Sequence, residues 1–125
     1  GIAPAENHVL LLEDEPSLAR NICRALGRGG HKGIHAASAS EGRKQLAAAR
    51  YDLVLADINM PVMNGLELVK RLRHRQAKLK LVAVSAYADD SKINEALEVG
   101  FDAYITKPIQ EYQLVDLIQS SGKSL

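Results

Sequence analysis

Five short runs of apolar residues recur along the chain, at residues 8–12, 33–37, 53–56, 79–84 and 103–106. Each run has the length of a β-strand, and polar residues largely fail to alternate with apolar ones inside it. A strand that is apolar on both faces is typical of a parallel sheet covered by helices on both sides. The runs therefore predict five buried, parallel strands.

Helical patterns fill the segments between these runs. One apolar stripe, with spacings of three and four, extends from Leu18 to Leu26 and is followed by Gly27. A second stripe begins at Ile93 and is followed by Gly100. Such spacing places side chains on one helical face, and glycine suits the end of a helix. Each stripe is expected to pack against the sheet.

Signals for helix starts agree with this division. Pro16 suits a first helical turn, because its missing N–H needs no partner there. Ser38 stands three residues before Glu41, and Asn64 stands three residues before Glu67. Both pairs have the spacing of a capping box or of a close variant.

Five strand-then-helix units predict an α/β fold with a doubly wound, five-stranded parallel sheet and five helices. The flavodoxin-like strand order 2-1-3-4-5 is the natural choice. With 125 residues, of which 46% are hydrophobic, the chain suits one domain with a real core. We expect this domain at residues 8–121, with an N-terminal extension or expression scar at 1–7 and a polar tail at 122–125.

Charge and cysteine content narrow the function classes only slightly. Sixteen basic residues against fifteen acidic ones give a net charge of +1, so no global field favours nucleic acid or a membrane surface. The basic cluster at residues 70–75 is interpreted as a solvated helix end. No apolar run reaches membrane-spanning length, and Cys23 is the single cysteine. These features are typical of a reducing, cytoplasmic setting.

Polar side chains follow the predicted strands at their carboxyl ends. Glu13 and Asp14 follow the first strand, Asp57 the third, Ser85 the fourth and Lys107 the fifth. Ligands of doubly wound sheets bind at this edge, where the first and third strands meet. Crowded carboxylates repel one another unless a cation neutralises them, and Mg²⁺ prefers oxygen ligands of this kind. The sequence therefore predicts a magnesium site here.

Four segments in order carry a specific resemblance. They are residues 11–16 (LLEDEP), 57–61 (DINMP) with Asn64-Gly65, 84–86 (VSA) and 106–108 (TKP). Through these segments the chain is similar, over nearly its whole length, to response-regulator receiver domains of two-component signalling, the family of chemotaxis-regulator-like receivers.

The resemblance implies a role for each matching residue. Asp57 would accept a phosphoryl group from a histidine kinase or a histidine phosphotransfer protein. Glu13, Asp14 and Asp57 would hold Mg²⁺, together with the backbone carbonyl of Asn59. The chain would then catalyse its own phosphorylation and dephosphorylation in single turnovers, unlike a metabolic enzyme. Three arrangements of the full-length protein stay open: the domain stands alone, precedes an effector domain, or ends a hybrid kinase.

Phosphoryl transfer is governed by positioning and by stabilisation of charge on the phosphoryl oxygens. Lys107 is expected to pair with one of these oxygens and the Ser85 hydroxyl with another. The resemblance implies a cis peptide bond between Lys107 and Pro108. It also implies that Ser85 and Tyr104 form a switch that couples phosphorylation to the face of the fourth helix, fifth strand and fifth helix.

Departures from the commonest family pattern concern Glu13, where Asp is commoner, and Ser85, where Thr is commoner. Tyr87 stands two residues after Ser85, where its bulk is expected to obstruct the water that hydrolyses the phosphoryl group.

Three alternatives share parts of this pattern. A flavodoxin-like redox module would need a first loop that attracts phosphate, whereas residues 13–15 are acidic. An aspartyl phosphatase would need an Asp-x-Asp sequence after its first strand. A phosphate-independent interaction module on the same fold is the remaining alternative, although every residue of the expected site is present.

Overall fold

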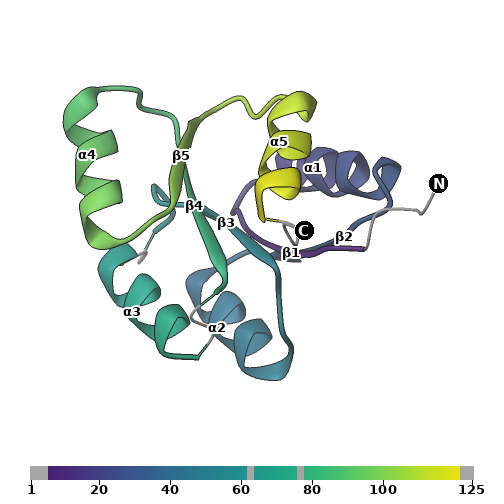
Figure 1. The fold of residues 1–125 in the computed structure, drawn as a ribbon, viewed down its shortest axis with the longest axis horizontal. Coiled ribbons are helices and arrows are strands. Elements are labelled where there is room, and N and C mark those ends of the chain that lie inside the picture. The colour runs from purple at the N-terminus through teal and green to yellow at the C-terminus, as the bar shows by residue number, and fades with distance from the viewer. Residues whose placement is uncertain (1–5, 62–63, 76–77, 122–125) are drawn as a thin grey trace.

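The computed structural model describes residues 6–61, 64–75 and 78–121. Within them, five strands alternate with five helices (Figure 1). The predicted fold class is confirmed. In chain order the elements are β1 (His8–Leu12), α1 (Pro16–Arg28), β2 (Lys32–Ala36), α2 (Ala39–Ala48), β3 (Leu53–Asp57), α3 (Gly65–Arg75), β4 (Lys80–Ser85), α4 (Asp90–Val99), β5 (Ala103–Thr106) and α5 (Glu111–Ser121).

The strands form one parallel sheet in the order β2-β1-β3-β4-β5, as predicted. Strand β1 pairs with β2 on one side and with β3 on the other, so the strand order reverses between β1 and β3. Strands β2 and β4 are displaced by one residue from the predicted ranges. Ligands of such sheets bind at the carboxyl edge beside this reversal.

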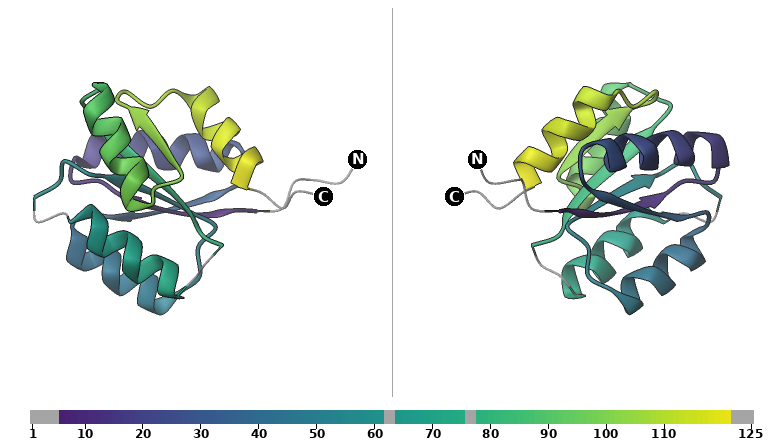
Figure 2. Two further views of the ribbon diagram at one scale, coloured as in Figure 1. Left: turned by 60° about the vertical axis from the view of Figure 1, so that its left-hand side comes forward. Right: turned by 90° about the vertical axis from the view of Figure 1, so that its right-hand side faces the viewer.

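Helices cover both faces of the sheet (Figure 2). Val9 and Leu11 of β1 belong to one core cluster, which also contains side chains of α1 and α5. Leu10 and Leu12 belong to the other cluster, with side chains of α2, α3 and α4. Successive residues of a strand face opposite sides, so an apolar run fills both cores at once.

Two helix starts follow the capping signals in the sequence. The Ser38 hydroxyl accepts a hydrogen bond from the Glu41 N–H at 3.1 Å, and Asn64 Oδ1 accepts one from the Glu67 N–H at 3.0 Å. The Glu41 carboxylate accepts from the Ala37 N–H at 2.6 Å, one residue before the cap. The start of α2 is thus a near variant of the capping box.

Glycine ends one helix as predicted and another slightly later. Gly100 follows α4 with a φ of 117°, in the left-handed region that glycine adopts without strain. Gly27, in contrast, lies within the last turn of α1, which continues to Arg28. The left-handed residue after α1 is Gly30, with a φ of 82°.

Most of the expected extension and the tail at 122–125 lie outside the described residues. Asn7, which we placed in the extension, is buried, and its carbonyl accepts a hydrogen bond from the Lys32 N–H at 2.9 Å. Among the helices of the described segments, none is long and apolar enough to cross a membrane.

Candidate functional site

Loops at the carboxyl edge of the sheet bring together side chains that are far apart in the sequence. Asp57 is the last residue of β3, and Ser85 is the last residue of β4. Glu13 directly follows β1, and Lys107 directly follows β5. Parallel pairing aligns these strand ends, so four predicted site residues meet at one edge.

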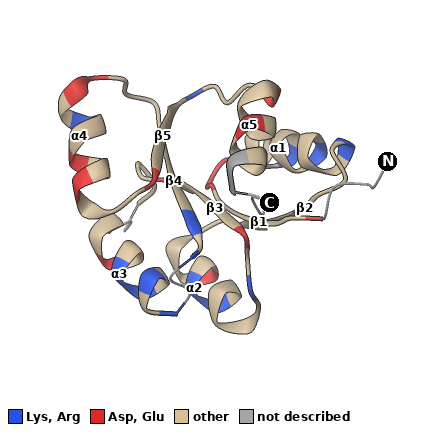
Figure 3. Cartoon of the chain, viewed as in Figure 1, with Lys and Arg blue, Asp and Glu red and all other residues tan. Residues whose placement is uncertain are grey.

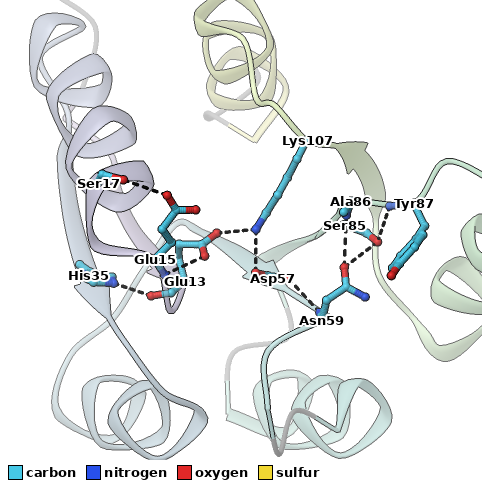
Figure 4. A network of polar contacts seen from close by, with 10 residues as sticks. All are labelled: Glu13, Glu15, Ser17, His35, Asp57, Asn59, Ser85, Ala86, Tyr87 and Lys107. Atoms are coloured by element: carbon cyan, nitrogen blue, oxygen red, sulfur yellow. Dashed lines mark hydrogen bonds and ion pairs between the residues drawn. The ribbon is translucent and has the colours of Figure 1, made fainter.

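One half of the site is ionic, and we call Glu13, Asp14, Asp57 and Lys107 the ionic cluster (Figure 4 shows all but Asp14). Lys107 Nζ lies 2.8 Å from Asp57 Oδ2 and 3.0 Å from Glu13 Oε1. Asp57 and Glu13 are buried, with 4% and 2% of their surface exposed, whereas Asp14 is exposed. A single lysine therefore bridges two buried carboxylates, and the third carboxylate of the cluster, Asp14, is exposed to solvent.

Backbone groups hold the two buried carboxylates in place. The Asn59 N–H donates to Asp57 Oδ1 at 2.9 Å, and the Glu15 N–H donates to Glu13 Oε2 at 3.0 Å. His35 Nε2 lies 2.6 Å from the carbonyl oxygen of Glu13 and serves as its donor. Each carboxylate thus has one oxygen on Lys107 and the other on a backbone N–H, which fixes its orientation.

Burial and the lysine shift two pKa values in this cluster. Burial raises the pKa of the Glu13 carboxyl, and so does the charge of Asp57, although hydrogen bonds from Lys107 and the Glu15 N–H act in the opposite direction. Burial lowers the pKa of Lys107, but its hydrogen bonds with Asp57 and Glu13 outweigh this effect and leave the pKa raised. Lys107 is therefore held in its protonated form, whereas ionisation of Glu13 is disfavoured unless further positive charge is present.

The carboxylates can also hold a metal ion. One oxygen from each of Glu13, Asp14 and Asp57 lies within 4.8 Å of the others. These are hard oxygen ligands, which suit Mg²⁺ or Ca²⁺ and do not suit zinc sites built from sulfur and nitrogen. A divalent cation would favour the ionised form of Glu13, which burial disfavours. The residues present therefore fit such an ion.

The other half of the site is uncharged, and we call Asn59, Ser85, Tyr87 and Tyr104 the hydroxyl network (Figure 4 shows the first three). The Ser85 hydroxyl donates to Asn59 Oδ1 at 2.8 Å and accepts from the Tyr87 N–H at 3.1 Å. The Tyr104 hydroxyl donates to the Tyr87 carbonyl at 2.5 Å. The network links the end of β4 to the half-buried Tyr104 of β5.

Strands β4 and β5 join the two halves. The Lys107 N–H donates to the Ser85 carbonyl at 2.8 Å, next to the register pair of Ser85 and Thr106. The peptide bond between Lys107 and Pro108 is cis, as the resemblance implies. Backbone pairing therefore sets the Lys107 side chain and the Ser85 hydroxyl at neighbouring positions of the sheet edge.

The structure brings together all the residues predicted for the ionic cluster. Ser85 is placed differently, because its hydroxyl bonds to Asn59 instead of facing Asp57. The side chain of Asn59, for which only a backbone role was expected, also accepts from the Ala86 N–H at 3.2 Å. Nothing in the sequence indicated this contact, since Asn59 lies in the turn after β3 and its side-chain direction does not follow from spacing.

Known proteins share this sequence pattern and fold. The family model of the response regulator receiver domain matches residues 9–119. The transcriptional regulatory protein AfsQ1 of Streptomyces coelicolor is 35% identical over 102 residues, which cover 82% of this chain and 45% of that protein. The response regulator protein FleR of Pseudomonas aeruginosa is 34% identical over 110 residues, covering 88% of this chain and 23% of that protein.

Solved structures give the same answer for the fold. Chemotaxis protein CheY4 of Vibrio cholerae superposes with a TM-score of 0.84 at 27% identity, covering 94% of this chain and 99% of that one. A CheY-like receiver domain from Methylobacillus flagellatus superposes with a TM-score of 0.80 at 30% identity, covering 94% and 99% of the two chains. The chain belongs to the response regulator receiver domain family of two-component systems. It spans less than half the length of the two regulators named above.

Proposed function

We propose that Asp57 accepts a phosphoryl group from a phosphohistidine donor, with Mg²⁺ held by Glu13, Asp14, Asp57 and the Asn59 carbonyl. One observation carries the proposal above the others. Asp57 is a buried carboxylate whose two oxygens are fixed by Lys107 and the Asn59 N–H, beside two further carboxylates. A carboxylate held in this way is an oriented nucleophile at a site suited to a divalent cation.

The transfer exchanges one bond to phosphorus for another. An Asp57 carboxylate oxygen attacks the phosphorus atom, and the P–N bond of the phosphohistidine breaks. The electron pair stays on the imidazole nitrogen, and Asp57 becomes an acyl phosphate. In the second half of the cycle, water attacks the phosphorus, and the bond between phosphorus and the Asp57 oxygen breaks. Asp57 is restored, and inorganic phosphate is released. The chain turns over once per phosphoryl group.

The residues around Asp57 supply positive charge and hydrogen-bond donors. Lys107 Nζ, at 2.8 Å from Asp57 Oδ2, is placed to follow the negative charge that moves onto the phosphoryl oxygens. The Ser85 hydroxyl is one further donor at the same edge once it leaves Asn59. Bound Mg²⁺ would neutralise charge on the carboxylates and on the incoming phosphoryl group.

The hydroxyl network supports a switch role for Ser85 and Tyr104. If the Ser85 hydroxyl turns to a phosphoryl oxygen, it gives up its hydrogen bond to Asn59. The Tyr87 N–H then loses the Ser85 oxygen as its acceptor. The Tyr87 carbonyl is the acceptor of the Tyr104 hydroxyl, so movement there reaches β5. We assign to this route the coupling of phosphorylation to the face of α4, β5 and α5.

The wider setting follows from the family. Receiver domains interact with histidine kinases and with effector domains, and AfsQ1 is named as a transcriptional regulatory protein. We assign residues 8–121 to the receiver unit, together with the buried Asn7, and place 1–6 and 122–125 outside it. The donor would be a histidine kinase or a histidine phosphotransfer protein in the cytoplasm, and the output an effector domain or hybrid kinase within a longer chain.

Incubation with a small phosphodonor, such as acetyl phosphate, tests the proposal. Intact mass measurement of the wild type with Mg²⁺ is expected to show the mass of one added phosphoryl group, and Asp57→Asn is expected to show none. Asp52→Asn is the matched control, since Asp52 lies at the opposite edge of the sheet, before β3. Equal labelling of wild type and Asp57→Asn would refute the acceptor role. Absence of labelling in all variants would favour a phosphate-independent interaction module.

A further inference from the structure

A groove between α2 and α3 lies apart from the ionic cluster. Its volume is about 230 Å³. Its floor consists of Leu46, Leu68 and Leu72, each of which has at most 8% of its surface exposed. Five exposed residues surround this floor, and all but Ala47 are basic: Arg43, Arg71, His74 and Arg75.

Few acids neutralise this rim. Arg71 pairs with Glu67 at 3.0 Å, but both side chains are more than half exposed, so the pair is weak. No acidic residue lines the groove. In the described part of the chain, neither Arg43 nor His74 belongs to an ion pair. The rim therefore keeps an excess of positive charge, although the whole chain carries only +1.

Stabilisation of helix ends explains Arg75 but does not explain Arg43. Arg75, at the end of α3, donates to the carbonyl of Leu46 in the last turn of α2 at 3.3 Å, as cations near helix ends commonly do. Arg43 lies inside α2, four residues after its start, where the helix dipole does not favour a cation. Packing of two helices brings Arg43 to the rim that α3 supplies, and neither helix alone accounts for the cluster.

The dimensions of the groove indicate what it can take. Small-molecule sites have volumes of roughly 300–1,000 Å³, so this groove is too small for a cofactor and suits one or two side chains of a docked segment. Leucine side chains on the floor match an apolar anchor, and the basic rim matches carboxylates beside it. This combination is the one used when an amphipathic helix binds in a groove.

The chain also carries the opposite charge on another surface. Figure 3 shows acidic residues along α4 and basic residues on α2 and α3. A second copy that placed α4 in the groove would form a head-to-tail contact, and such contacts extend into open chains unless the rotation closes. A different protein with an acidic segment would match the basic rim equally well and would not form open chains.

We propose that the α2–α3 groove docks an acidic segment of another protein, with a leucine-type anchor on the floor and carboxylates on Arg43, Arg71 and Arg75. This surface is distinct from the α4, β5 and α5 face assigned to the switch. The groove contains none of the residues assigned to phosphoryl transfer at Asp57.

A synthetic helical peptide with two leucines one turn apart and flanking glutamates is the probe. Titration into isotope-labelled wild-type protein, followed by amide chemical shifts, is expected to move signals of α2 and α3 and to weaken with added salt. The double variant Arg43→Glu/Arg71→Glu is expected to bind about tenfold more weakly, as two reversed rim charges predict. The matched control is Arg20→Glu/Arg24→Glu on α1, with the same change in net charge and an expected effect below about twofold.

Several outcomes would overturn the proposal. These are shifts confined to other elements, equal weakening by both double variants, equal binding of a peptide whose leucines are replaced by serine, or no shifts at all. Tighter binding of a DNA duplex to the same residues would replace the acidic segment as occupant. Self-association of the wild type through α4, seen by sedimentation, would replace it with a second copy. Circular dichroism and labelling of Asp57 show whether each variant remains folded.

Discussion

The ionic cluster and the hydroxyl network share one sheet edge but differ in what holds them. In the ionic cluster, Lys107 bridges two buried carboxylates, and removing one partner of a buried ion pair costs about 3–5 kcal/mol. In the hydroxyl network, neutral groups exchange hydrogen bonds whose net worth is about 0.5–1.5 kcal/mol each. The difference suits the first half to fixed chemistry and the second half to movement.

Burial separates the carboxylates Asp57 and Glu13 from Tyr104, although Ser85 of the hydroxyl network is as buried as they are. Strand β3, which ends at Asp57, is buried along its whole length, and β1 is buried except at its first residue. Strand β5 lies at the edge of the sheet, and only Ile105 of its four residues is fully buried. A group on a central strand is held on both sides, whereas Tyr104 on the edge strand has room to change position. The site thus has a rigid half and an adaptable half.

Removal of the metal should affect the ionic half most. Chelation with EDTA is expected to reduce labelling of Asp57 below detection, because Glu13, Asp14 and Asp57 would then repel the incoming phosphoryl group with only Lys107 to oppose them. Intact mass after incubation with acetyl phosphate measures this, and excess Mg²⁺ should restore the signal. Labelling that persists in EDTA would show that the carboxylate cluster does not serve as a metal site.

Loss of the Lys107 charge should have the next largest effect. Lys107→Ala is expected to slow labelling of Asp57 by roughly a hundred- to a thousand-fold, as removal of one preorganised stabilising group does elsewhere. Time courses of intact mass provide the rate. Lys44→Ala, on the exposed surface of α2, is the matched control and should label at the wild-type rate. A Lys107→Ala rate within a few-fold of wild type would contradict the role assigned to the amine.

Truncation of Tyr104 should separate the two halves. Tyr104→Ala removes the hydroxyl that donates to the Tyr87 carbonyl but leaves the ionic cluster intact, so labelling of Asp57 should change by less than about twofold. Amide shifts induced over α4, β5 and α5 by beryllofluoride and Mg²⁺ should shrink. Tyr112→Ala, an exposed aromatic on α5, is the control. Undiminished shifts in Tyr104→Ala would remove the tyrosine from the switch.

Truncation of Tyr87 should have the smallest effect. The Tyr87 side chain is 55% exposed at the rim, and its ring is expected to hinder the water that attacks the phosphoryl group. Tyr87→Ala is therefore expected to lose phosphate a few-fold faster, with little change in the rate of labelling. Decay of the labelled mass after removal of the donor measures the lifetime. An unchanged or longer lifetime would assign the ring no shielding role.

Most of the fold and the ionic cluster were predictable because they depend on patterns that strand pairing enforces. Apolar runs identified the strands, and the parallel sheet then brought Glu13, Asp57 and Lys107 to one edge. Charge at a strand end is a strong signal because its position follows from topology alone. The expected end of α1 at Gly27 was early because glycine tolerates the last helical turn as well as the cap.

Features that depend on side-chain direction were less predictable. The bond between Ser85 and Asn59 requires a particular rotamer of each side chain, and no sequence spacing fixes rotamers. The groove between α2 and α3 required the packing of two helices, since Arg43 and the basic residues at 70–75 are far apart in the sequence. Interpreting residues 70–75 as a helix end alone therefore missed the surface that α2 completes.

The identity of the labelled residue is the most direct test of Asp57 as the phosphoryl acceptor. Borohydride reduces an aspartyl phosphate to homoserine, so reduction of the labelled protein followed by peptide sequencing in a mass spectrometer marks the acceptor. Homoserine is expected at position 57, and Asp14, Asp52 and Glu13 are expected to remain unmodified. Reduction at any of these other carboxylates, with Asp57 intact, would contradict the acceptor role of Asp57.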